Sequence, residues 1–116
     1  MTKRKRGLPP LPKYVHSLLG PIEVQQVKMV DEKDSLGECN FENGVIRIKK
    51  TLERRQAHHT LAHERSHRIL WDAGIHHMLD KLPKKYAELE EMICDAFATA
   101  HVNEMLSKLP NPQDTE

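Results

Sequence analysis

Apolar and polar positions alternate on both sides of Asn43-Gly44, and this pattern predicts a β-hairpin. The pair at its centre is typical of a two-residue turn, because both residues readily adopt the left-handed backbone that such a turn needs. A turn at this pair places Cys39 opposite Ile48, with Phe41 on the same face of the strand. The hairpin would therefore present one apolar face to a core.

A second alternating stretch covers residues 22–30, with a phase slip at Gln25-Gln26 that is typical of a bulged strand. The polar residues that follow, up to Gly37, predict a loop. Together with the hairpin, this strand predicts a small, mostly antiparallel sheet.

Helical periodicity replaces the alternation after the hairpin. Thr51 is a residue type that caps helix N-termini and Gly74 is the type that ends them, so we expect a helix from residue 51 to about Ala73. Apolar residues occur on several sides of this helix, which predicts that it is covered on several sides. One arc stays polar and contains Arg54, Arg65, Arg68 and Asp72.

A second long helix is expected from Pro83, a favourable first helical residue, to about Lys108. Residues 75–82 are interpreted as a connection between the two helices. The elements together predict an α+β fold in which the sheet packs on both helices. The predicted apolar face of the second helix contains Tyr86, Leu89, Ile93, Ala96, Phe97 and Ala100.

Composition and charge limit the size and class of this fold. The 116 residues include 18 Lys and Arg, 17 Asp and Glu, and 2 Cys, so we expect one compact domain with a net charge of +1. Basic and proline-rich residues 1–13 predict a flexible arm, residues 14–109 the single domain, and residues 110–116 a loose tail. No apolar run reaches the length of a membrane span, and two isolated cysteines are typical of a cytoplasmic protein.

The sequence HERSH at residues 63–67 has the HExxH pattern and falls inside the first predicted helix. His63 and His67 are one turn apart on one face, so both imidazoles can bind one Zn²⁺ ion. Glu64 lies beside that face, where its carboxylate could take a proton from zinc-activated water. His59 continues the spacing, but one ion cannot bind both outer histidines, which lie about 12 Å apart along the helix. We therefore expect His59 to be a neighbour of the site and not a ligand.

Two histidines leave the site incomplete, because a catalytic zinc usually has three protein ligands. On the second helix, Glu91 and Asp95 are one turn apart and share a stripe with Ala98, which suggests partly buried carboxylates. Glu91 could bind the metal while Asp95 orients one histidine. Glu90 is a rival because it borders the predicted apolar face, and periodicity alone leaves the choice open. Further candidates on this helix are Glu88 and His101.

Three other residues are candidates for the wall of the cleft. His76 and His77 follow the first helix and Tyr86 lies near the start of the second, and each could help to stabilise an oxyanion. The alternative roles are a polar loop for the two histidines and core packing for the tyrosine.

Two segments of the chain resemble the ImmA/IrrE-like zinc metallopeptidases, a family with many phage-encoded members. Residues 60–70, TLAHERSHRIL, resemble the HExxH helix of that family, and residues 91–98, EMICDAFA, resemble its later helix of the form Glu-x-x-Ala-Asn-x-Phe-Ala. Residues 37–40 and the strand 45–49 resemble the stretch that precedes the active helix. The resemblance extends over about residues 21–106.

The resemblance implies a minimal zincin with His63, His67 and Glu91 as zinc ligands and Glu64 as the general base. Asp95 takes the position of the family's Asn, which restores the Glu-x-x-x-Asp spacing of gluzincins.

Two further positions depart from the family pattern. Cys94 replaces an Ala, which is a small change, whereas Arg65 replaces an apolar residue. Helical geometry places Arg65 on the polar arc, opposite the two histidines, so it need not disturb the metal.

We therefore expect a zinc metallopeptidase that hydrolyses peptide bonds, with one Zn²⁺ per chain and a protein or peptide as substrate. The strand 45–49 is expected to border the cleft and to pair with an extended peptide. So few cleft-building loops also suggest a protein partner that completes the site. We expect no membrane and no nucleic-acid partner, and a location in the cytoplasm of a bacterium or of a phage-infected host cell.

Two other classes of function stay open. The first is a catalytically inactive zinc-binding protein of the same fold that regulates a partner. The second is a nucleic-acid-associated protein that acts through basic patches, using Lys3 to Arg6 together with Lys49, Lys50, Arg54 and Arg55.

Overall fold

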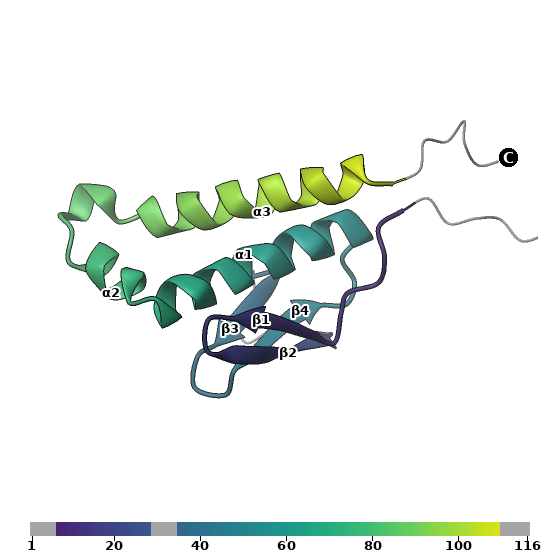
Figure 1. The fold of residues 1–116 in the computed structure, drawn as a ribbon, viewed down its shortest axis with the longest axis horizontal. Helices are drawn as coiled ribbons and strands as arrows, with labels where there is room; N and C mark the ends of the chain where they lie inside the picture. Colours follow the sequence, from purple (N-terminus) through teal and green to yellow (C-terminus); the bar gives the residue numbers. More distant parts are fainter. Residues whose placement is uncertain (1–6, 29–34, 110–116) are drawn as a thin grey trace, which may run out of the picture.

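Four strands and three α-helices make up the fold of residues 7–28 and 35–109, which are the residues that the computed structural model describes (Figure 1). Helix α1 covers the sheet, and α3 packs on α1 on the side away from the sheet (Figure 1). None of the helices in these ranges is long and apolar enough to cross a membrane. The elements are β1 Tyr14–Ser17, β2 Gly20–Val27, β3 Gly37–Asn40, β4 Val45–Lys49, α1 Arg54–Asp72, α2 Ile75–Asp80, a 3₁₀ turn Lys84–Tyr86 and α3 Leu89–Ser107.

The sheet has the strand order β1-β2-β4-β3. The two outer pairings are antiparallel, whereas the central pairing of β2 with β4 is parallel. The predicted α+β class and the mostly antiparallel sheet are therefore confirmed. The strand predicted at 22–30 begins earlier, at Gly20, and its last two predicted positions lie outside the described residues.

The predicted hairpin is present, but its predicted register is wrong by two residues. Cys39 lies opposite Ile46, and a four-residue loop, 41–44, replaces the two-residue turn. The reason is Asn40, whose side-chain oxygen accepts hydrogen bonds from two backbone N–H groups of the loop at 3.0 and 2.9 Å and so closes it early. A shift of two residues preserves the faces of a strand, so Cys39 still packs against the core with Ile46.

Helix α1 begins later than predicted and ends as predicted. The side chain of Glu53 accepts a hydrogen bond from the backbone N–H of Gln56 at 2.8 Å, so Glu53 caps the helix in place of Thr51. At the other end Gly74 has a φ of 78°, and its N–H donates to the carbonyl of Trp71 at 3.0 Å. The predicted stop at Gly74 is confirmed.

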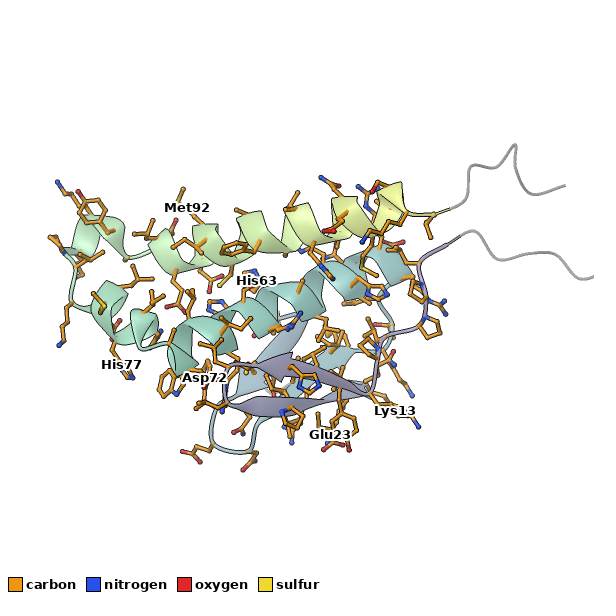
Figure 2. The ribbon with its side chains drawn as sticks, viewed as in Figure 1. Lys13, Glu23, His63, Asp72, His77 and Met92 are labelled. Carbon is orange, nitrogen blue, oxygen red and sulfur yellow. The ribbon has the colours of Figure 1, made fainter. Side chains whose placement is uncertain are left out.

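The polar arc of α1 faces protein backbone. Arg65 donates to the carbonyl of His16 in β1, and Arg68 donates to the carbonyl of Phe41 in the hairpin loop, each at 2.8 Å. Asp72 pairs with Arg68 at 3.0 Å, and its side chain is only 1% exposed, beside β1 (Figure 2). Arg65 and Arg68 thus supply donors to backbone carbonyls that lie behind the helix.

Two predictions about the second half of the chain are wrong. The segment predicted as a connection contains α2, and Pro83 precedes the 3₁₀ turn, so that α3 begins only at Leu89. The predicted apolar face is buried only in part: Leu89 and Ile93 are half-buried, whereas Tyr86 and Phe97 are 44% and 59% exposed. Because α3 packs on α1 through small side chains, its buried residues are Cys94, Ala98 and Val102.

Residues 7–13 pack on the domain, so the prediction of a flexible arm up to residue 13 is wrong for this part. Leu8 is 4% exposed, and its carbonyl accepts a hydrogen bond from Arg54 at 3.0 Å. His58 donates to the carbonyl of Pro9 at 2.6 Å. The other arm residues, 1–6, and the predicted tail 110–116 lie outside the described residues.

Gly37 marks a close approach between β3 and α1. An added Cβ would lie 2.7 Å from Cγ2 of Thr60 and 3.0 Å from Cδ1 of Ile48. We expect Gly37→Ala to lower the free energy of unfolding by about 1–3 kcal/mol, because the strand must move to relieve the overlap. Urea unfolding measures the change. Gly7→Ala is the matched control, since an added Cβ there meets nothing within 4 Å; equal losses in both variants would contradict the prediction.

Candidate metal centre

Three side chains from two helices converge on one point. Helix α1 supplies His63 and His67, and α3 supplies Glu91. The Nε2 atoms of the two histidines are 3.1 Å apart. One carboxylate oxygen of Glu91 lies 2.9 Å from Nε2 of His63, and the other lies 3.0 Å from Nε2 of His67. Figure 2 shows His63 between α1 and α3. The structure thus brings together the three residues that the sequence predicts as ligands.

Local geometry explains this convergence. Residues four apart on a helix leave it from the same face, so α1 presents both imidazoles side by side. Cys94 and Ala98 are completely buried where α3 packs on α1, and their small side chains let the helices approach closely. The first turns of α3 therefore reach the middle of α1.

Each histidine is oriented by a carboxylate on its other ring nitrogen. Nδ1 of His63 donates to Asp95 at 2.7 Å, and Nδ1 of His67 donates to Glu90 at 2.6 Å. Asp95 thus lies where the sequence predicts an orienting carboxylate. Glu90, considered as a rival ligand, contacts the remote nitrogen instead of the convergence point.

Glu90 is ionised by its surroundings. Its side chain is 16% exposed, and burial alone would raise the pKa of its carboxyl. Hydrogen bonds from His67 and from His76, the latter at 2.7 Å, outweigh burial and hold that pKa below its usual value. The link from Glu90 to His76 joins residues of α2 and α3, and no local sequence pattern indicates it.

The arrangement fits a zinc ion. Atoms bound to one tetrahedral zinc at about 2.0–2.1 Å lie about 3.3 Å from one another, close to the separations found here. When Nδ1–H of each ring donates to a carboxylate, the lone pairs of both Nε2 atoms face each other and the Glu91 carboxylate. This group of atoms could hold a metal ion, and two imidazoles with one carboxylate are a donor set that zinc binds.

Glu64 lies in a cavity of about 540 Å³ that also contains the convergence point. Burial raises the pKa of its carboxyl above the ordinary value; the nearby His63 and His67 act against this shift, and Glu91 acts with it. A carboxylate with a raised pKa is a stronger proton acceptor. The further lining residues from β3 and its surroundings are Ser35, Leu36, Gly37, Glu38, Cys39 and Phe41.

Cys39 lines the same cavity. Burial, reinforced by the nearby Glu64 carboxylate, raises the pKa of its thiol to about 12. At neutral pH the thiol therefore stays protonated, and it does not belong to the cluster of metal-binding atoms.

The remaining predicted site residues are spread more widely. His59 lines the cavity and lies 3.3 Å from the hydroxyl of Thr99, as expected for a neighbour of the site. His76 also lines the cavity, whereas Tyr86 lines an adjacent hollow. His77 is exposed and points away from α3 (Figure 2).

Two expectations about the borders of the cleft are wrong. β4 (45–49) lies between β2 and β3 and has no free edge, so the strand beside the cavity is β3, at the end of the sheet. The side chains of Glu91 and Asp95 are 59% and 62% exposed, although the sequence suggests partial burial, because the cavity opens toward the first turns of α3.

A second cavity, of about 600 Å³, lies on the other side of the α1–α3 contact. It is lined mostly by apolar groups, among them Ile69 and Phe97, and also by His101. Its described lining contains none of the convergent side chains, so His101 is far from the candidate metal centre.

Comparisons of the chain with models of protein families, with curated proteins and with solved structures found no match.

Proposed function

We propose that this protein is a zinc-dependent metallopeptidase of the ImmA/IrrE-like type that binds one Zn²⁺ per chain. The observation that supports it most is the convergence of His63, His67 and Glu91 in the cavity that also holds Glu64. Three protein ligands and a separate carboxylate beside them are typical of a zinc site that catalyses hydrolysis.

Bound zinc would supply a Lewis acid that polarises a peptide carbonyl and makes water more acidic. Glu64 removes a proton from that water as the water oxygen forms a bond to the carbonyl carbon. The carboxyl then transfers the proton to the amide nitrogen while the C–N bond breaks. One water is consumed, and a carboxylic acid and an amine leave the site.

The position of β3 at the end of the described sheet suggests how a peptide substrate would lie. Gly37 to Cys39 border the cavity, and β3 is the end strand of the sheet. An extended peptide can add to such an edge through backbone hydrogen bonds, which would carry its scissile bond past Glu64. A protein partner that covers the open side of the cavity stays part of the proposal, as does the cytoplasm, since Cys39 and Cys94 are both free.

The alternatives differ from this proposal in measurable ways. An inactive regulatory protein of the same fold would retain zinc without cleaving peptides. The nucleic-acid alternative depends on basic residues of which Lys3 to Arg6 lie outside the described range, and Arg54 is engaged with the carbonyl of Leu8. Steeply salt-dependent DNA binding would favour it.

The metal content of histidine variants tests the zinc site. We expect about one zinc per chain in the purified protein, lost in His63→Ala and in His67→Ala, because each removes one of the few metal-ligand bonds. His59→Ala should retain zinc, since His59 contacts Thr99 and is not part of the cluster. Elemental analysis after dialysis measures the zinc content of each variant. Loss of zinc in His59→Ala but not in His67→Ala would contradict the ligand assignment.

A further inference from the structure

His76 is the one described imidazole of α2 that lines the cavity of the candidate metal centre. The other lining residues come from β3 and the residues on either side of it, from α1 and from α3. The side chain of His76 is 28% exposed, so a bound ligand can reach it.

The orientation of this imidazole is fixed from two sides. Nδ1 of His76 contacts one carboxylate oxygen of Glu90 at 2.7 Å, while the other oxygen of Glu90 holds His67 at 2.6 Å. The ring of Trp71 packs against His76 at 4.9 Å between centroids, and Trp71 is itself stacked on Phe41 at 4.6 Å. One carboxylate thus positions a proposed zinc ligand and a second imidazole at the same time.

The bond to Glu90 leaves Nε2 as the ring nitrogen that is available to a ligand. In the imidazolium form both ring nitrogens are donors, and the Glu90 carboxylate balances the charge. A donor at this place is useful, because the carbonyl oxygen of a peptide becomes negative when water adds to its carbon.

We propose that His76 is a catalytic residue, oriented by Glu90 and Trp71, whose Nε2 donates a hydrogen bond to the carbonyl oxygen of the bound peptide as that oxygen gains charge. This inference rests on the proposed peptidase function. It distinguishes His76 from His77, which also contacts Trp71 but points away from α3 (Figure 2).

Two substitutions of His76 separate its two nitrogens. In His76→Asn the side-chain amide can replace Nδ1 and keep the contact with Glu90, but it does not extend to the position of Nε2. In His76→Gln the longer amide can place a donor near the position of Nε2. His77→Asn is the matched control, since it makes the same exchange at the neighbouring position.

The kinetic test uses a fluorogenic peptide that the zinc-loaded wild type cleaves, selected from a random library. We expect His76→Asn to lower kcat by about 10²–10³-fold with KM changed much less, as for loss of one oxyanion donor. His76→Gln should recover part of the rate, and His77→Asn should match the wild type. Equal kcat values for His76→Asn and His77→Asn would overturn the inference, as would loss of zinc in His76→Asn, which would show a structural role.

Binding of phenylphosphonate to the zinc-loaded proteins tests His76 independently of turnover. This tetrahedral anion should bind at least about tenfold more weakly to His76→Asn than to His77→Asn, because a charge-assisted hydrogen bond is lost. Equal affinities would overturn the role of His76. Absence of peptide cleavage in the wild type would instead count against the proposed peptidase function, and the phosphonate titration would still decide whether His76 contacts an anion.

Discussion

Glu64→Gln is expected to retain zinc and to lose peptide cleavage by at least about 10²-fold, because the amide keeps the shape of the side chain but accepts no proton. The structure supports a large effect. Glu64 lies in the cavity of the convergence point, and burial raises the pKa of its carboxyl, which makes it a good proton acceptor. The imidazoles of His63 and His67 are oriented by Asp95 and Glu90 and not by Glu64. Replacement of Glu64 should therefore leave the metal-binding residues in place.

Glu38→Gln is the matched control for this experiment. Glu38 lines the same cavity, but its carboxylate forms an ion pair with Arg47 of β4 at 3.3 Å. We expect this variant to keep most of the activity. Cleavage of an unfolded protein substrate, followed by mass spectrometry with zinc content measured in parallel, gives both quantities. Equal cleavage by wild type and Glu64→Gln would contradict the catalytic role and favour the regulatory alternative.

The parts of the site that lie on one helix could be predicted from the sequence, because helical spacing alone determines them. His63 and His67 are four apart, so any helix through them presents both rings on one face. The end of α1 at Gly74 follows from an equally local cause, since the left-handed backbone there suits glycine.

The strands were harder to predict because several local signals compete. The Asn43-Gly44 pair favours a two-residue turn, yet the side chain of Asn40 closes a longer loop and determines the register. β1 turns into β2 through Leu18-Leu19, which lacks the residue types that mark a hairpin. The parallel pairing of β2 with β4 and the packing of residues 7–13 on the domain join parts of the chain that are far apart in sequence, so no short window contains them.

The buried face of α3 is difficult to predict for a different reason. Aromatic residues such as Phe97 usually mark a core, but α3 packs on α1 through Cys94, Ala98 and Val102. A close contact between two helices selects small side chains, so the large side chains of Met92 and Phe97 remain exposed. The role of Glu90 depends on that choice, because its two partners lie on α1 and α2.

Glu91→Gln is expected to raise the dissociation constant for zinc by more than about 100-fold, because a neutral amide replaces a charged metal ligand. The carboxylate oxygens of Glu91 are the α3 atoms that contact both Nε2 nitrogens, at 2.9 and 3.0 Å. Competition with a fluorescent chelator measures the affinity over the range required.

Two variants on the same helix make this test specific. Glu90→Gln should weaken zinc binding less, by about 10–100-fold, because Glu90 orients His67 through its remote nitrogen without reaching the metal. His101→Ala should bind zinc like the wild type, since His101 lines the cavity on the other side of the α1–α3 contact. If Glu91→Gln keeps the wild-type affinity while Glu90→Gln loses zinc, the third ligand is Glu90, and the Nδ1 contact of His67 must be exchanged for a metal bond when zinc is present.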